Sequence, residues 1–314
     1  QDIVSGDYNE KCVVRCNGVV ENFAQGVENA TFIPLSGKDF MDSGFIAEEV
    51  EHSWYKYPAG KTSLHPSEGI TDPNFTGPKV GTKEDWKELD ETKKYSWIKS
   101  PTMKGKPCEV GPLAKYIVVY TKVKKGILKN PTWAEKMMVD QVDRVSAVLG
   151  LPAHVWLCST VGRTAARALD AQVAVNLQKY FHNKLVANIK SGDTTVAYSE
   201  NWHPEKWPKD VKGVGILDAP RGALGHWVHI KNSRIENYQC VVPTTWNACP
   251  KTVAKEHGAY EESMLDTHLK KPEHPLEVVR SIHSFDPCLA CATHLYNKKG
   301  ELIASANTDV FCLG

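Results

Sequence analysis

The 314-residue sequence has almost no excess of charge of either sign, because 38 Lys and Arg oppose 37 Asp and Glu. Together with a hydrophobic content of 41%, this balance excludes a disordered chain, an acidic tail and a polybasic nucleic-acid-binding protein. The sequence also lacks a long hydrophobic run, since its most apolar stretch is Ile117–Tyr120. A helix that spans a membrane needs about 20 apolar residues. We therefore expect neither a membrane-spanning helix nor a nucleic-acid partner.

A leader segment, internal repeats and a complete disulfide set are missing as well. The sequence begins Gln1-Asp2-Ile3 without Met and without a charged-then-apolar leader, which predicts a processed or partial chain. No repeat and no low-complexity segment is present. Nine cysteines, an odd number at irregular spacing, indicate reduced thiols of which a few do chemistry. The length suits one large domain over residues 1–314.

The composition and the periodicity of the sequence change near residue 111. Residues 1–110 are rich in Gly, Pro and aromatic residues and are expected to be loops that pack on a larger body. Thr132 and Glu135 resemble a capping box, which predicts a helix that ends at Gly150. A second helix is predicted from near Ser159 to about Lys190, and at 1.5 Å per residue it would be roughly 45 Å long. We expect this helix to be the central rod of a helical body that spans residues 111–294.

The remaining periodic segments complete the predicted fold. The apolar face of the long helix has members spaced by four, four and three residues, namely Leu169, Val173, Leu177 and Tyr180. Residues 226–231 and 234–241 flank Asn232-Ser233, which predicts a β-hairpin. A last helix is predicted from about Pro275 to His283, and Asp286-Pro287 ends it. The predicted fold class is α+β, a large, mainly helical body with long central helices and a peripheral hairpin or sheet region.

The most informative segment directly follows the last helix. Cys288 and Cys291 lie three residues apart, and His294 follows after three more. Thiolates select soft or borderline ions such as zinc, iron or nickel. Two thiolates supply only half of a four-coordinate site, so other ligands must come from elsewhere. The spacing alone leaves three alternatives open: a metal site, a redox dithiol, or two unrelated buried thiols.

The sequence around these thiols, Asp286-Pro287-Cys288-x-x-Cys291-x-x-His294, resembles the second metal-binding motif of the nickel–iron (NiFe) hydrogenase large subunit. Four further segments resemble the same family in the same order, namely Gly111–Ala114, Gly162–Arg167, Ala219–Trp227 and Val242–Asn247. The chain thus resembles the C-terminal portion of a large subunit of the membrane-bound uptake type. This resemblance implies an oxidoreductase that reversibly oxidises H2 to protons and electrons.

The resemblance also implies a ligand set for two metal sites. In that family a nickel and an iron share four cysteine sulfurs, and the iron carries carbon monoxide and two cyanides. One terminal nickel thiolate and one bridging thiolate would here be Cys288 and Cys291. His294 and the main-chain carbonyl of Cys240 match ligands of a magnesium ion.

The same resemblance assigns roles around the open metal position. Arg221 would stand over it, where a permanently charged guanidinium could orient hydrogen or take its proton. Asp286 would hold Arg221 through a charge-assisted pair, and Pro220 would line the pocket. Thr244, next to Pro243, matches a hydroxyl that binds a cyanide ligand. The residues alone favour a surface or packing arginine and a strand threonine, and they leave open an aspartate that makes a local turn with Pro287.

The sequence departs from the family in two places. The family's first metal motif, Arg-x-Cys-Gly-x-Cys, is missing, because Cys12 and Cys16 have the wrong spacing and order. The resemblance therefore implies half of a metal site and no hydrogenase activity for this chain alone. Residues 295–314, the 20 residues after His294 (314 minus 294), resemble the removable C-terminal extension of a precursor. In the family a nickel-dependent endopeptidase cuts at that point.

Partners and location follow from the resemblance too. It implies an iron–sulfur small subunit that takes the electrons, a membrane cytochrome b subunit, a maturation endopeptidase and nickel-insertion chaperones. It places the protein peripherally, on the periplasmic side of the cytoplasmic membrane. Two rival functions stay open: a non-catalytic zinc-binding module that uses Cys288, Cys291, His294 and Cys312, and a degenerate hydrogenase-related subunit.

Overall fold

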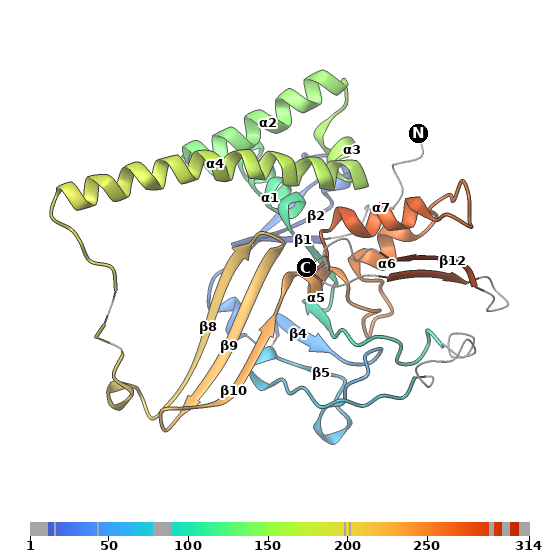
Figure 1. Cartoon of the computed structure of the whole chain (residues 1–314), viewed down its shortest axis with the longest axis horizontal. Helices are drawn as coiled ribbons and strands as arrows, with labels where there is room; N and C mark the ends of the chain where they lie inside the picture. Colours follow the sequence, from blue (N-terminus) through green and yellow to red (C-terminus); the bar gives the residue numbers. More distant parts are fainter. Residues whose placement is uncertain are drawn as a thin grey trace.

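The computed structural model describes residues 17–42, 44–77, 90–197, 199–200 and 202–288, and the backbones of the strands at 12–15, 292–296 and 302–307. These residues form helices and small, mostly antiparallel sheets (Figure 1), so the predicted α+β class is confirmed. Within the described residues, no helix is both long enough and apolar enough to cross a membrane.

Four helices build the helical part of the body, namely α1 (Pro112–Lys124), α2 (Trp133–Leu149), α3 (Ala153–Leu157) and α4 (Thr160–Lys190). The capping box at the start of α2 is confirmed, because the Thr132 hydroxyl accepts from the Glu135 N–H and the Glu135 carboxylate accepts from the Thr132 N–H. Gly150 ends this helix in a left-handed conformation, where glycine is favoured. The Ser159 side chain caps α4 by accepting from the Gly162 N–H.

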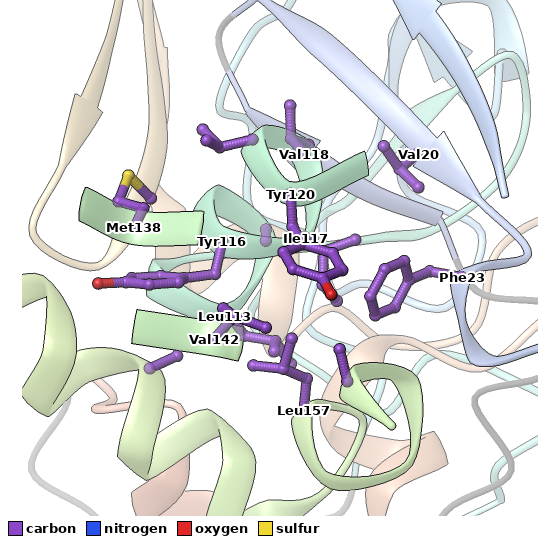
Figure 2. Close-up of a cluster of buried hydrophobic side chains, with 14 of the residues drawn as sticks. Val20, Phe23, Leu113, Tyr116, Ile117, Val118, Tyr120, Met138, Val142 and Leu157 are labelled. Atoms are coloured by element: carbon purple, nitrogen blue, oxygen red, sulfur yellow. The ribbon is translucent and has the colours of Figure 1, made fainter. Parts of the chain in front are cut away.

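Helix α1 is the centre of the larger hydrophobic core. Tyr116 and Ile117 of α1 are almost completely buried and lie between Val142 of α2, Leu157 of α3 and Phe23 from the N-terminal region (Figure 2). The Tyr116 hydroxyl donates to the buried Gln141 side chain over 2.6 Å, which satisfies the polar groups inside this core. The four-residue apolar run of the sequence is therefore a core helix.

Helix α4 begins and ends where the sequence predicts, but only its first half is central. Leu169, Val173 and Leu177 pack on the core, whereas Tyr180 is 45% exposed and contacts the Trp133 ring. Beyond Leu177, large apolar side chains are more than half exposed; these are Phe181, Leu185 and Ile189. Figure 1 shows this half of α4 extending away from the rest of the body. Within the described part of the chain, the C-terminal half of α4 is therefore not packed as a central rod.

In the region predicted to be loops, the described residues form seven short strands. One sheet has the order β3-β2-β1-β7, from β1 (Cys12–Arg15), β2 (Gly18–Glu21), β3 (Thr31–Pro34) and β7 (Cys108–Val110). A second has the order β5-β4-β6, from β4 (Ile46–Glu49), β5 (Ser63–Leu64) and β6 (Ser100–Met103). Short 3-10 helices lie between them, namely η1 (Phe23–Gln25), η2 (Asp39–Met41), η3 (Pro58–Gly60) and η4 (Pro66–Glu68). The loop prediction is corrected here: such short strands acquire their order from pairing with distant segments.

The predicted hairpin is confirmed and belongs to a three-stranded antiparallel sheet. The strands β8 (Asp210–Ala219), β9 (Gly222–Lys231) and β10 (Arg234–Val241) lie in the order β10-β9-β8, and η6 (Pro204–Lys206) precedes them. Asn232 and Ser233 both have positive φ, which is the geometry of a tight two-residue hairpin turn. Trp227 of β9 is 1% exposed and donates from its indole to the Phe40 carbonyl. It belongs to a second hydrophobic core, which also contains Phe40, Ile46, Val110 and Trp246, so the sheet is attached to this core.

Short elements complete the C-terminal region, namely α5 (Pro243–Asn247), α6 (Ala259–Met264), α7 (Leu276–Ser284), β11 (Ala292–Tyr296) and β12 (Leu302–Asn307). Helix α7 matches the predicted last helix, with Pro275 as its N-cap residue. Strands β11 and β12 pair antiparallel.

Candidate active-site pocket

A pocket of about 320 Å³ lies where three chain segments meet. They are the turn between β8 and β9, the start of α5, and the turn after α7. Its lining is mostly apolar, with one guanidinium, two hydroxyls and one thiol, and it consists of Ile98, Ala219, Pro220, Arg221, Leu224, Val242, Pro243, Thr244, Thr245 and Cys288. The structure thus brings Pro220, Arg221, Pro243, Thr244 and Cys288 to one pocket. An apolar cavity with a few polar groups is the usual form of a binding or active site.

The turn that carries Arg221 is fixed against the start of α1. Gly222 follows it with φ +128°, and a Cβ atom there would lie 2.5 Å from the backbone nitrogen of Gly111. Gly111 itself has φ +133° and approaches the Arg221 carbonyl closely. Both positions therefore require glycine, for backbone conformation and for space. The Asn247 side chain ties α5 to the same region by bonding both the N–H and the carbonyl of Val110.

Arg221 and Asp286 form the predicted pair. Arg221 Nε donates to the Asp286 carbonyl over 2.8 Å, and Nη2 donates to Asp286 Oδ1 over 3.2 Å. Both side chains are about two-fifths exposed, at 38% and 39%. Asp286 has φ +55°, a left-handed conformation that Asp tolerates better than most residues. The pair thus holds the guanidinium at two points, at the wall of the pocket.

Thr244 lies in the first turn of α5, so the alternative interpretation of a strand residue is wrong. The Cys288 N–H donates to its hydroxyl over 3.2 Å. A hydroxyl that accepts in this way still has its own hydrogen to donate to another acceptor. This bond fixes the turn after α7 to α5 and places the exposed Cys288 thiol at the pocket.

A buried ionic network contacts the end of α7, directly before the turn that carries Asp286 and Cys288. Arg163, which is 1% exposed, makes two bonds to the Glu109 carboxylate, from Nε over 2.7 Å and from Nη2 over 3.0 Å. Its Nη1 donates to Ser284 Oγ, and its guanidinium lies 3.8 Å from the Phe285 ring centre. Burial lowers the pKa of Arg163, and the nearby positive charge of Arg167 lowers it further. The network connects β7, α4 and the end of α7.

Sequence reasoning assigned no role to Glu109, Arg163, Arg167 or Ser284. A signal was present, because Arg163 and Arg167 stand four residues apart in the segment Gly162–Arg167 and therefore lie on one side of a helix. Their partners could not be read from the sequence, since Glu109 and Ser284 are 54 and 121 residues away from Arg163.

The remaining predicted ligands are not brought together by the described residues. Cys291 lies outside them, and only the backbone of His294 is described, in β11. Cys240 is exposed in β10, opposite His226 of β9. Within the described part of the chain, no group of three or more His, Cys, Asp or Glu side chains could hold a metal ion. The proposed magnesium site stays a prediction.

The α+β fold and the pocket, which combines one thiol with an aspartate-bound arginine, agree with one class of protein, the nickel-dependent hydrogenases. Residues 8–294 match the nickel-dependent hydrogenase family, so the chain belongs to that family. It is 50% identical over 268 residues to the uptake hydrogenase large subunit of Rhizobium leguminosarum bv. viciae, and this match covers 85% of this chain and 43% of that protein. It is 40% identical over 303 residues to the hydrogenase-1 large chain of Escherichia coli K12, and this match covers 96% of this chain and 48% of that protein.

Solved structures agree with the fold. The reduced, active Ni-Fe-Se hydrogenase from Desulfomicrobium baculatum superposes with a TM-score of 0.63 at 26% identity, over 90% of this chain and 51% of that chain. The chain therefore spans about half the length of the curated relatives that it matches.

Proposed function

We propose that this chain is the C-terminal portion of the large, catalytic subunit of a nickel–iron uptake hydrogenase. The reaction is the reversible oxidation of H2 to two protons and two electrons. One observation carries the proposal: the Cys288 thiol, the Arg221–Asp286 pair and the Thr244 hydroxyl meet at one apolar pocket. Membership of the family and relatives named uptake hydrogenase large subunits support it.

The described residues supply one donor of a thiolate-bound metal centre. Cys288 supplies a soft sulfur donor at the pocket, and its exposure lets a metal reach it. Cys291 would supply the second thiolate of the motif. When bound, a nickel–iron centre with carbon monoxide and cyanide on the iron supplies the redox chemistry and an open position for hydrogen. The two other thiolates must come from outside this chain's motif.

The chain's own side chains would prepare the pocket for this chemistry. Arg221 presents a charged guanidinium there, and Asp286 keeps it in place by two bonds. Pro220 and Leu224 contribute apolar wall that excludes water. Thr244 holds the backbone of Cys288 and can donate its hydroxyl hydrogen to an acceptor in the pocket. Such preorganised groups stabilise developing charge without having to reorganise.

The C-terminal half of α4 supports the proposal that this chain works within a larger protein. Leu185 and Ile189 are 57% and 55% exposed on a helix that extends away from the body (Figure 1). An isolated helix of this length is marginal in water, so its apolar side needs a covering surface. We propose an iron–sulfur small subunit as electron acceptor, with a membrane cytochrome b subunit beyond it, on the periplasmic side of the cytoplasmic membrane.

Maturation is part of the same proposal. Residues 295–314 would be the extension that an endopeptidase removes after nickel-insertion chaperones have delivered the metal. His294 and the Cys240 carbonyl would bind magnesium. A precursor is expected to run about 2 kDa heavier than the mature chain, at roughly 110 Da per residue, and intact mass before and after nickel loading measures this difference.

The test of the function is a metal and activity measurement on a complete large subunit that contains this chain, purified with its small subunit. We expect about one nickel per complex, iron in excess of nickel because the clusters of the small subunit add to it, and hydrogen-dependent dye reduction. Cys288→Ser should remove nickel and activity together, because an alcohol is a poor ligand for nickel at neutral pH. Cys158→Ala, a half-buried thiol away from the pocket, is the matched control and should keep both.

Other metal contents would refute the proposal in distinct ways. Zinc in place of nickel in the purified complex would indicate the zinc-binding module. A folded complex that contains neither nickel nor zinc and does not oxidise hydrogen would indicate the degenerate subunit.

A further inference from the structure

Asp286 faces a second arginine in addition to Arg221. The Nε atom of Arg167 lies 3.8 Å from Asp286 Oδ2, while Arg221 Nη2 binds Oδ1. Arg167 Nη1 donates to the Ser284 carbonyl over 2.7 Å, at the C-terminal end of α7. A cation at this end of a helix also interacts favourably with the helix dipole. Each oxygen of the carboxylate thus faces a different guanidinium.

The Nε–H of Arg167 is an unusual group. This nitrogen is buried and has no hydrogen-bond partner among the described residues, although it points its charge at Asp286. Buried donors in folded proteins are normally satisfied. At 3.8 Å this nitrogen contributes charge but no hydrogen bond, so Asp286 is held by a hydrogen bond at Oδ1 and by charge at Oδ2.

The backbone alone does not hold this carboxylate. The main chain of Asp286 is set by its left-handed conformation and by a bond from its N–H to the His283 carbonyl. The side-chain torsion of an aspartate carboxylate is broad, however, and one cation at Oδ1 leaves it free to turn. A second cation at Oδ2 restricts that rotation.

Arg167 can act in this way because its own support is rigid. It lies on the buried first half of α4, one turn after Arg163, which the Glu109 carboxylate and Ser284 hold from three nitrogens. We infer that Arg167 is a positioning residue: it orients the Asp286 carboxylate and thereby fixes the Arg221 guanidinium at the pocket. This inference deepens the proposed function and rests on it for its role in catalysis.

The test measures the mobility of Arg221 directly, in the full chain and without metal or hydrogen. The exchange of the Arg221 Nη2–H, which bonds the Asp286 carboxylate, is followed by NMR of the arginine side chains, and the signal is assigned by its loss in Arg221→Lys. We expect Arg167→Gln to accelerate this exchange on the order of tenfold, as for the loss of one charge-assisted hydrogen bond. Arg167→Lys should give a smaller increase, since it restores the charge but cannot also reproduce the bond to the Ser284 carbonyl.

Two comparisons separate positioning from general loosening. Arg280→Gln, at an exposed arginine on α7, should leave the Arg221 exchange unchanged. The Trp156 indole N–H, which bonds Ser146 Oγ over 2.9 Å, reports on the helical core and should also be unchanged in Arg167→Gln. Acceleration of both signals together would overturn the inference, because it would mean that the whole body is loosened.

An unchanged Arg221 exchange rate in a folded Arg167→Gln chain would equally overturn the inference. If that variant does not fold, Arg167→Lys decides, and exchange at the unsubstituted rate refutes positioning. None of these outcomes depends on hydrogen oxidation, so the proposed function could fail while the positioning role stands.

Discussion

The buried ion pair between Glu109 and Arg163 offers the most sensitive test of how the pocket is supported. Both side chains are 1% exposed, and two bonds of 2.7 and 3.0 Å join them. The substitution Glu109→Gln removes the negative charge and turns one acceptor oxygen into an amide donor that faces a guanidinium donor. The buried guanidinium then loses the carboxylate charge that opposes its own.

The structure sets the size of the effect. Removal of one partner from a buried pair typically costs about 3–5 kcal/mol. The glutamine oxygen can still accept one bond, and Ser284 Oγ still accepts from Arg163 Nη1. We therefore expect the lower end, a loss of about 3 kcal/mol in the free energy of unfolding, which is a large part of the total for a typical domain.

Urea unfolding followed by circular dichroism measures this loss. The matched control is Lys93→Ala, because Lys93 pairs with Asp90 at 3.1 Å but is 77% exposed. An exposed pair of this kind should contribute less than about 1 kcal/mol. If Glu109→Gln costs no more than the control, the reasoning about burial is refuted.

A double variant identifies the source of the loss. Glu109→Leu combined with Arg163→Met removes both charges and should recover most of the stability, since apolar replacements of buried pairs are often neutral. A double variant as unstable as Glu109→Gln would show that shape, and not charge, accounts for the loss.

Three further predictions concern backbone space, helix burial and pH. Gly222→Ala should lower the free energy of unfolding by about 2 kcal/mol or more, because its Cβ would lie 2.5 Å from a backbone nitrogen at the start of α1 and its φ is +128°. Urea unfolding measures this loss, and Gly215→Ala, which has open space at its Cβ, should lose distinctly less. On α4, Val173→Ala should cost about 2 kcal/mol, whereas Leu185→Ala should stay within about 0.5 kcal/mol, since the two side chains are 4% and 57% exposed; equal losses in thermal unfolding would contradict this. Burial raises the pKa of the Glu49 carboxyl in the folded chain. Its contribution to the free energy of unfolding is fully present below the pKa of the unfolded chain, about 4.3, and is lost as pH rises through the higher pKa of the folded chain. Glu49→Gln, which stays neutral, should therefore gain stability relative to the unsubstituted chain between about pH 4 and pH 8, and urea midpoints at the two pH values check the sign.

Several elements could be predicted because their signals are local. The capping box of Thr132 and Glu135 starts α2 at the expected residue, and Ser159 starts α4. The turn at Asn232-Ser233 depends on two neighbouring residues, and the sequence shows both. Such signals depend on residues within one turn of each other, so no knowledge of the rest of the fold is needed.

Other features needed contacts between distant segments. The strands between residues 12 and 110 are mostly two to four residues long, and β1 pairs with β7 across about 90 residues of intervening sequence. The exposure of the second half of α4 also could not be predicted, because the periodicity of Leu177 and Phe181 indicates an apolar face but not what covers it. The sequence pattern states that a side is apolar, and packing alone determines whether it is buried.

The sequence by itself determined the family, the thiol motif and the pairing of Arg221 with Asp286, because these depend on residue types in a specific order. Only the tertiary structure revealed that Glu109, Arg163 and Arg167 support the same turn, since a buried guanidinium needs a carboxylate or carbonyl partner wherever the chain can supply one. Glu109 is supplied from β7 and the Ser284 carbonyl from α7, more than 170 residues apart in the sequence. Burial of charge, which is a property of the packed molecule, thus decided which residues hold the pocket in place.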